Sequence, residues 1–391
     1  MIFACRGAII LIGRIYLWTS VPHRFISGLR AATAPMGPAA KRRHRSVVAA
    51  SIPFPQVKSV LNFDQVADRA ISFQTPSRET ALAMLKVSDS DFPALFSAAW
   101  RVRHYFYGKR VSVQVLTNAK SGLCPEDCHY CSQSCVSQAE IARYPLKAVK
   151  LLVDEAKAAR QSMANRFCMG LSGRVVKDEE VDALCAAIRT IKEEVGIEVC
   201  CSLGFVNPEQ ARRLQSAGLD RVNHNLNTSA RYYPSICSTH TYDDRMQNLM
   251  ICREAGLEIC SGGIVGQGEG DEDVIDMLMA LQKVDPKSLP INFLIPVDGT
   301  PFAQMNHKLT PMRCLKVLAV ARLLHPKAEI RVAGGREYHL RSLQPMALFL
   351  VNSIFVDGYL TEGGQGREET FRMIEDVGFE VVAEETTGAH V

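Results

Sequence analysis

The sequence predicts an α/β fold, a (β/α)8 TIM-type barrel with an N-terminal helical extension. Eight short runs rich in β-branched residues alternate with helical segments over about 250 residues, as a barrel of this kind requires. The loop after the first run holds three cysteines, whereas an open doubly wound sheet would place a glycine fingerprint there. The composition, 47% hydrophobic and 22% charged over 391 residues, is typical of a globular enzyme.

Residues 1–50 are expected to form a disordered leader or a transit-like extension. Residues 1–63 hold nine Lys and Arg and no Asp or Glu. The apolar run at residues 8–12 is far too short to span a membrane. Two alternatives remain: a secretory signal, against which the reducing chemistry downstream argues, and a spurious extension with the true start at Met36.

Charge and cysteine content limit the partners and the compartment. Without the basic leader, the net charge of +4 becomes about −5, and no basic stripe suited to nucleic acid remains. Thirteen cysteines, an odd number, are too sparse for a small disulfide-stapled domain and favour a reducing compartment. We therefore expect a cytoplasmic protein, or a mitochondrial one if the leader is a transit peptide, that binds neither nucleic acid nor membranes.

Apolar periodicity divides the rest of the chain. Spacing near 3.6 predicts helices at 60–71 and 78–85 within an N-terminal helical segment, 51–110, which a glycine at 108 ends. The barrel is expected over 111–360, followed by a C-terminal helix and tail over 361–391. Its predicted strands are 111–116, 166–171, 197–203, 221–226, 258–265, 290–297, 329–333 and 353–356. Its predicted helices are 145–161, 177–195, 208–217, 242–255, 272–283 and 311–324.

The loop after the first predicted strand carries the strongest chemical signal. Cys124, Cys128 and Cys131 have the spacing C-x3-C-x2-C. Thiolates so close in sequence can wrap one iron–sulfur cluster, which normally takes four protein ligands. Three ligands leave one iron open to bind a small molecule. This loop lies at the end of the barrel where active sites are found.

Other interpretations of this loop fit less well. Zinc sites usually pair two C-x2-C units, and only one is present. Cys135 is a conceivable fourth ligand, but its spacing is typical of neither zinc sites nor ferredoxins.

Several predicted strands carry polar residues that a packed barrel interior would not favour. Arg166 shares a face with Cys168, and at most one of Cys200 and Cys201 points inward. On the fourth strand three amides alternate with other residues: Asn223, Asn225 and Asn227. Strands five, six and seven each carry one further polar residue, Cys260, Asn292 and Arg331 in that order. Singly, each is commonly structural. Together they predict a polar interior, in which three inward cysteines from three strands can hold a second metal centre.

Two further features are less specific. The glycine-rich segment 262–269 lets the backbone approach a ligand closely, or is a plain strand-to-helix turn. Cys185, Cys252 and Cys314 lie on predicted helices and are expected in the core, whereas Cys5 and Cys237 have no predicted role.

From residue 62 to 382 the chain resembles the biotin synthases of the radical S-adenosylmethionine (SAM) superfamily. The resemblance rests on six segments that fit the family pattern: 124–134, 166–170, 223–229, 260–266, 290–294 and 330–337. It implies that Cys124, Cys128 and Cys131 hold a [4Fe–4S] cluster that binds SAM. It also implies that Cys168, Cys200, Cys260 and Arg331 ligate a [2Fe–2S] cluster, and it selects Cys200 over Cys201.

The resemblance also assigns binding residues. Those implied for SAM are Met169, Gly170, Asn225, Asn227, Arg245, Gly262 and Ile264; those implied for substrate are Asn225, Asn292 and Thr361. The chain departs from the family pattern at Leu171-Ser172, where many members have two alanines, and at Glu362, which replaces a second threonine. Some members also carry Asp at the position of Asn227.

The implied activity is insertion of sulfur from the [2Fe–2S] cluster into dethiobiotin, the last step of biotin formation. The implied partners are an electron donor such as flavodoxin or ferredoxin, iron–sulfur assembly factors and a second copy of the chain in a homodimer. Two alternatives remain, another radical SAM enzyme of this group with a different small-molecule substrate, and a non-enzymatic iron–sulfur sensor.

Overall fold

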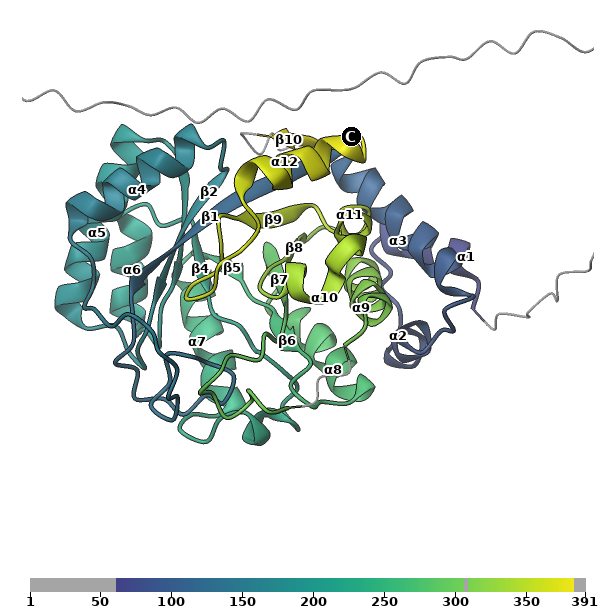
Figure 1. Ribbon diagram of the computed structural model, residues 1–391, viewed down its shortest axis with the longest axis horizontal. Coiled ribbons are helices and arrows are strands. Elements are labelled where there is room, and N and C mark those ends of the chain that lie inside the picture. Colours follow the sequence, from purple (N-terminus) through teal and green to yellow (C-terminus); the bar gives the residue numbers. More distant parts are fainter. Residues whose placement is uncertain (1–60, 306–308, 383–391) are drawn as a thin grey trace, which may run out of the picture. The chain divides into compact units, whose positions relative to one another are not determined.

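The described part of the chain, residues 61–305 and 309–382 of a computed structural model, forms a closed parallel barrel (Figure 1). Its strands follow the order β1-β2-β3-β4-β5-β7-β8-β9, and β9 pairs with β1 to close the ring. The short β6 pairs with β7, so β5 and β6 together form the fifth position of the barrel. The predicted (β/α)8 architecture is confirmed. The leader predicted at 1–50 lies outside the described residues.

The strand bounds agree with most of the predicted runs. They are β1 Arg110–Lys120, β2 Arg166–Leu171, β3 Glu198–Ser202, β4 Arg221–Asn223, β5 Glu258–Cys260, β6 Gly263–Val265, β7 Ser288–Phe293, β8 Glu329–Val332, β9 Ser353–Val356 and β10 Glu380–Val382. β7 begins two residues before the prediction and ends at Phe293; Leu294 still donates to the Val265 carbonyl of β6, but Pro296 has no N–H with which to continue the ladder. β10, which was not predicted, pairs outside the ring with Arg110–Ser112 of β1.

Helices cover the outside of the barrel. They are α4 Val149–Gln161, α5 Asp178–Glu194, α6 Pro208–Ser216, α7 Tyr242–Glu254, α8 Asp271–Leu281, α9 Pro311–Leu324, α10 Arg336–Leu340, α11 Gln344–Ala347 and α12 Arg367–Asp376. Local sequence sets several starts: Asn207 and Thr241 accept bonds from the first-turn N–H groups of α6 and α7, and Pro208 occupies the first position of α6. No helix in the described residues is long and apolar enough to cross a membrane.

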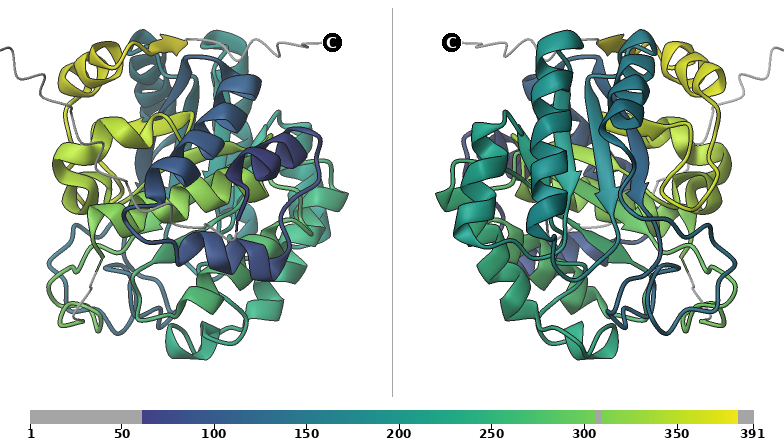
Figure 2. Two further views of the ribbon diagram at one scale, coloured as in Figure 1. Left: turned by 90° about the vertical axis from the view of Figure 1, so that its right-hand side faces the viewer. Right: turned by 90° about the vertical axis from the view of Figure 1, so that its left-hand side faces the viewer.

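The N-terminal extension comprises three helices, α1 Phe63–Ile71, α2 Arg78–Leu85 and α3 Phe92–Tyr107. They lie together against α8 and α9 on one flank of the barrel (Figure 2). Apolar residues of α3, including Leu95 and Val102, are fully buried there. The extension therefore adds to the outer hydrophobic core.

Candidate active site

A cavity of about 290 Å³ opens at the carboxyl ends of the strands. It brings together ten residues expected to act there: Cys124, Cys128, Cys131, Gly170, Asn225, Asn227, Arg245, Ile264, Asn292 and Thr361. These residues come from the loop after β1, from the ends of β2, β4, β6 and β7, from α7 and from the loop after β9. The barrel topology thus brings most of the predicted site residues to one cavity.

The cysteine loop is held in shape by local bonds. The Cys131 N–H donates to the Cys128 carbonyl at 3.1 Å, and the Gly122 N–H donates to Oε1 of Gln133 at 2.9 Å. Gly122 has φ +67°, and a Cβ there would lie 2.6 Å from Cγ of Arg143. Burial raises the pKa of the Cys131 thiol to about 11, so the free thiol keeps its proton until a metal displaces it.

Tyr130 and Asn227 connect this loop to the fourth strand. The Asn227 amide donates to the Tyr130 hydroxyl at 2.6 Å. Asn227 itself has φ +71° and bridges to Gly263, with its N–H on the Gly262 carbonyl and its carbonyl accepting from Ile264. Burial raises the pKa of Tyr130 well above its usual range, so it remains a neutral hydroxyl at the cavity wall.

Arg245 of α7 brings a positive charge to the cavity, which Arg174 also lines. Its guanidinium donates to the Tyr233 hydroxyl, to the Asn225 carbonyl at 2.9 Å and to Nε2 of His240 at 2.9 Å. A guanidinium has further N–H donors beyond these three, in a planar fork that suits a carboxylate. Arg245 is therefore fixed on one side and able to bind an anionic group on the other.

Beneath the cavity, three cysteines from neighbouring strands form one buried cluster. Cys168, Cys200 and Cys260 are at most 5% exposed and pack with Leu116 and Phe355. Cys168 of β2 lies in register with Cys200 of β3. Cys201 belongs instead to the outer hydrophobic core, so Cys200 is the inward residue of the pair. Three soft thiol ligands meeting at one point suit an iron–sulfur cluster.

Arg331 of β8 completes this thiol cluster and is itself tightly held. Its NH1 nitrogen lies 4.0 Å from Sγ of Cys260, and its NH2 nitrogen donates to Glu329 at 2.6 Å. Nε donates to Gln114 at 2.8 Å, and the guanidinium lies over the Phe355 ring at 4.7 Å. These contacts present one end of the guanidinium to the thiols.

Glu329 is the centre of a charge network at the floor of the barrel. Its carboxylate accepts from Arg166 at 3.0 Å and from Arg221 at 2.8 Å as well as from Arg331. Burial alone would raise the pKa of Glu329, but the three guanidinium groups outweigh it and lower that pKa well below the usual range. The floor therefore favours an ionised carboxylate, which holds Arg331 in place.

Asn223 joins the cavity to the thiol cluster. It lines the cavity, and its amide donates to Sγ of Cys260 at 3.3 Å. Oδ1 of Asn225 accepts from Asn223 at 3.3 Å and from the Gly262 N–H at 3.0 Å. Oδ1 of Asn292 accepts from the Gly334 N–H at 2.9 Å, and its amide donates to the Gly263 carbonyl. The cavity thus lies between the two cysteine sets, with amides along its wall.

The loop after β9 covers the opposite wall. The Thr361 hydroxyl lies 2.9 Å from that of Ser132 in the cysteine loop, and Glu362 also lines the cavity. A Cβ on Gly170 would come 2.8 Å from Leu360, so glycine allows this loop to close on β2.

Two residues expected to bind SAM do not line the cavity. The Met169 side chain is buried in the outer core, which leaves only its backbone near the site. Gly262 abuts β7, where a Cβ would lie 1.8 Å from the Pro290 carbonyl oxygen. Their roles as SAM contacts remain predictions.

Sequence reasoning missed the floor network and the surroundings of Cys237. A signal for the floor existed: β2 and β4 begin with Arg166 and Arg221, whereas β3, β5 and β8 begin with Glu198, Glu258 and Glu329. Opposite charges at the starts of neighbouring parallel strands must meet at one end of the barrel. Cys237 offered no comparable signal, because its neighbour Cys128 is 109 residues away in the chain.

Two family models match the chain. One describes the Radical SAM superfamily and matches residues 120–281. The other describes the Biotin and Thiamin Synthesis associated domain and matches residues 290–380. Together they cover most of the barrel and its C-terminal elements.

Curated proteins named biotin synthase are similar over most of the chain. The protein of Bacillus cytotoxicus is 44% identical over 326 residues, which cover 83% of this chain and 98% of that protein. The protein of Rhodopirellula baltica is 46% identical, and the match covers 82% of this chain and 89% of that protein. The protein of Bacillus subtilis strain 168 is also 46% identical, and the match covers 81% of this chain and 94% of that protein.

Solved structures share the fold. A crystal structure of methylornithine synthase superposes with a TM-score of 0.70 at 20% identity and covers 81% of this chain and 97% of that one. The X-ray structure of the FeFe-hydrogenase maturase HydG from Carboxydothermus hydrogenoformans superposes with a TM-score of 0.70 at 19% identity. The match covers 82% of this chain and 79% of that one. At such low identity these likenesses show the barrel fold alone.

Proposed function

The chain belongs to the biotin synthase family of the radical SAM superfamily, and from this membership we propose that it inserts sulfur into dethiobiotin to form biotin. The observation that carries the proposal is the second cysteine set. Cys168, Cys200 and Cys260 meet below a cavity whose other side holds the cysteine loop. An enzyme that only cleaves SAM needs the loop cysteines and has no use for thiols below them.

The residues present fit the cofactors of the family. Cys124, Cys128 and Cys131 would hold the [4Fe–4S] cluster, with one iron left for SAM. Cys168, Cys200, Cys260 and Arg331 would hold a [2Fe–2S] cluster. When bound, the first cluster and SAM supply a 5′-deoxyadenosyl radical that removes hydrogen from unactivated carbon, and the second cluster supplies sulfur.

The chain's own contribution is position, charge and exclusion of water. Arg245 would bind the carboxylate of SAM with the N–H donors that it does not use within the protein. Asn225 and Asn292 would face the ureido ring of dethiobiotin, whose donors and acceptors match an amide. Tyr130 and the loop that carries Leu360 enclose the cavity, which protects a reactive carbon centre from side reactions.

Recognition of the substrate tail is the proposed role of Thr361. It lies beside Glu362, whose carboxylate would repel an acid at the same position. We infer that the tail carboxylate contacts Thr361 and stays clear of Glu362.

The electron donor, the assembly factors, the cellular location and the oligomeric state are also proposed from family membership. The cofactors need a one-electron donor such as flavodoxin or ferredoxin, and iron–sulfur assembly factors to load the clusters. The oxygen sensitivity of such sites supports a cytoplasmic, reducing location. A homodimer is expected from the family resemblance.

The test is an assay of the anaerobically reconstituted protein with dethiobiotin, SAM and a reductant. The proposal expects biotin and 5′-deoxyadenosine. Cys128→Ala should abolish both products, because the two remaining thiolates cannot hold the [4Fe–4S] cluster that binds SAM. Formation of 5′-deoxyadenosine without any biotin by the unaltered protein would instead point to another substrate within the superfamily.

A further inference from the structure

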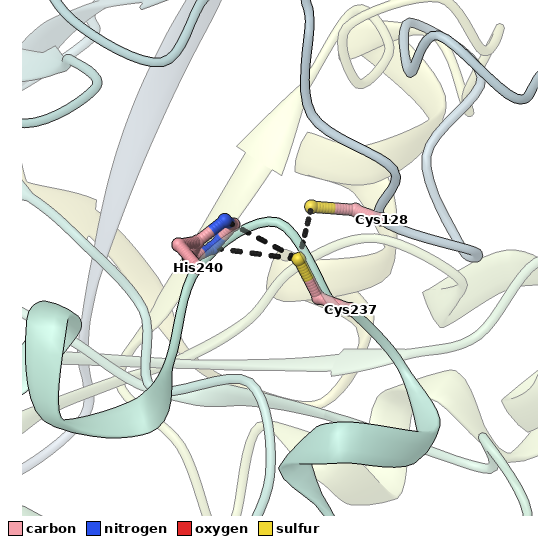
Figure 3. A group of neighbouring side chains, drawn as sticks. All are labelled: Cys128, Cys237 and His240. Carbon is pink, nitrogen blue, oxygen red and sulfur yellow. Dashed lines mark hydrogen bonds between the residues drawn. The ribbon is translucent and has the colours of Figure 1, made fainter.

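Two buried side chains beside the cysteine loop have no part in the proposed reaction. Cys237 and His240 lie in the segment that joins the 3₁₀ turn Tyr233–Ser235 to α7. Figure 3 shows the Cys237 thiol between Cys128 of the cysteine loop and the ring of His240. Cys128, Cys237 and His240 are 7%, 2% and 4% exposed, so the three donor atoms meet in the protein interior.

The donor atoms all lie within 4.8 Å of one another, and two pairs that involve Cys237 are close to the distances of a tetrahedral metal site. Sγ of Cys128 and Sγ of Cys237 are 3.8 Å apart. Sγ of Cys237 lies 3.2 Å from Nδ1 and 3.8 Å from Nε2 of His240. Metal–sulfur bonds of about 2.3 Å and metal–nitrogen bonds of about 2.0 Å place the corners of a tetrahedron about 3.8 Å apart for two sulfurs and about 3.5 Å apart for sulfur and nitrogen.

The surroundings hold the histidine as metal-binding histidines are usually held. Nδ1 of His240 hydrogen-bonds the buried carboxylate of Glu126, which assigns the proton to Nδ1 and leaves the lone pair on Nε2. Arg245 donates to Nε2 at 2.9 Å and would release it, keeping its bonds to Tyr233 and Asn225. A carboxylate behind the ring also makes the imidazole a stronger ligand.

We propose that Cys128, Cys237 and His240 bind a single divalent cation of borderline softness, Fe²⁺ or Zn²⁺, while the cysteine loop holds no cluster. Two thiolates and one imidazole are the donors that such ions prefer. The site does not depend on the proposed function, but it shares Cys128 with the proposed [4Fe–4S] cluster. The single ion and the cluster therefore exclude each other.

The test uses the full-length chain, reduced, freed of iron and sulfide and titrated anaerobically with Co²⁺ alone. The expected result is the intense visible spectrum of tetrahedral Co²⁺ with sulfur-to-cobalt charge transfer. Cys237→Ser and His240→Gln should each weaken Co²⁺ binding at least about tenfold. Loss of a group that only hydrogen-bonds a metal ligand already lowers metal affinity about 10–100-fold, and these two residues are ligands themselves. Zn²⁺ should displace the cobalt.

Matched controls separate this site from the other thiols. Cys124→Ser alters the loop outside the trio, and Cys260→Ala alters the thiol cluster beneath the cavity, so both should retain the Co²⁺ spectrum and affinity. Circular dichroism of each variant checks that it is folded. Unchanged Co²⁺ binding in folded Cys237→Ser and His240→Gln would overturn the proposal, as would equal weakening by Cys124→Ser.

A second measurement probes the exclusion. Zn²⁺ bound beforehand should slow the uptake of iron and sulfide by the loop in the unaltered chain, and this delay should vanish in Cys237→Ser. An equal delay in both proteins would contradict the shared use of Cys128. Because the cobalt titration involves neither SAM nor dethiobiotin, its outcome stands apart from the activity assay.

Discussion

At the scale of single residues, Glu329 is the group on which the interior of the barrel depends. One buried carboxylate balances Arg166, Arg221 and Arg331. Buried charges are costly unless they are paired, so removal of the shared partner leaves three guanidinium groups exposed to one another. The same carboxylate orients the arginine proposed to ligate the second cluster.

Glu329→Gln should therefore destabilise the protein strongly. We expect the free energy of unfolding to fall by about 3–5 kcal/mol, the usual cost of breaking a buried ion pair. Urea denaturation measures it. Glu258→Gln is the matched control, because its carboxylate also pairs with Arg221 but is 45% exposed, and Arg221 keeps its buried partner Glu329. The loss there should be smaller. Equal losses in the two variants would show that the floor network does not act as described.

The residues of the site differ in how far they could be predicted from sequence. Spacing alone indicated the cluster loop, and strand periodicity brought polar residues to one interior. Periodicity could not choose between Cys200 and Cys201, since the choice depends on which face turns inward; the family resemblance chose Cys200, and the register with Cys168 agrees. The pairing of Cys128 with Cys237 was beyond prediction, because a contact across 109 residues depends on how two loops fold back over the barrel.

At the scale of elements, the break between β5 and β6 shapes the cavity wall. The chain passes from Cys260 to Gly263 directly against β7, where Gly262 has no space for a side chain. This close approach lets Cys260 reach the thiol cluster while the next residues line the cavity. The glycine-rich turn thus has a packing reason that does not require a ligand.

Gly262→Ala should expose this constraint. The added Cβ would lie 1.8 Å from the Pro290 carbonyl oxygen, so β7 must shift. Overpacking of this kind costs about 1–3 kcal/mol, measured as a loss of stability in urea. Gly366→Ala is the control, since a Cβ there meets nothing within 4 Å and the backbone keeps a negative φ. Stability unchanged in both variants would argue against the tight β5–β7 passage.

Element boundaries were less predictable than the elements themselves. The eight barrel strands follow from apolar, β-branched runs, but their ends depend on contacts between distant segments. β4 ends at Asn223, and just beyond it Oδ1 of Asn225 accepts from the Gly262 N–H in the segment after β5. β10 is three residues long and exists through its pairing with Arg110–Ser112, which no local pattern could reveal.

At the scale of the whole molecule, two cysteine sets and one cavity lie along the axis of a single barrel. The loop cysteines lie at its carboxyl end, the cavity below them and the thiol cluster beneath the cavity, above the charged floor. The parallel pairing of β1 with β9 closes the ring, so that residues from different strands can meet in one interior. The count of alternating strands and helices was enough to predict that closure.

The acid-free leader, residues 1–50, belongs neither to the described residues nor to the family resemblance. A chain that begins at Ser51 should therefore fold, bind iron and sulfide as the full-length chain does and keep its activity. Iron and sulfide content together with biotin formed per chain measure this. A large loss of either in the shortened protein would show that the leader contributes to the barrel or its site.

The central claim, that the inward cysteines supply the site of sulfur transfer, is tested most directly by Cys260→Ala compared with Cys185→Ala. Cys185 lies buried on α5, away from the cavity. Mössbauer spectra with iron content, beside biotin formed per chain, separate the two clusters. The account predicts that Cys260→Ala keeps the [4Fe–4S] signal and the production of 5′-deoxyadenosine but loses the [2Fe–2S] signal and biotin, whereas Cys185→Ala keeps all four. A [2Fe–2S] signal and normal biotin formation in Cys260→Ala would contradict it.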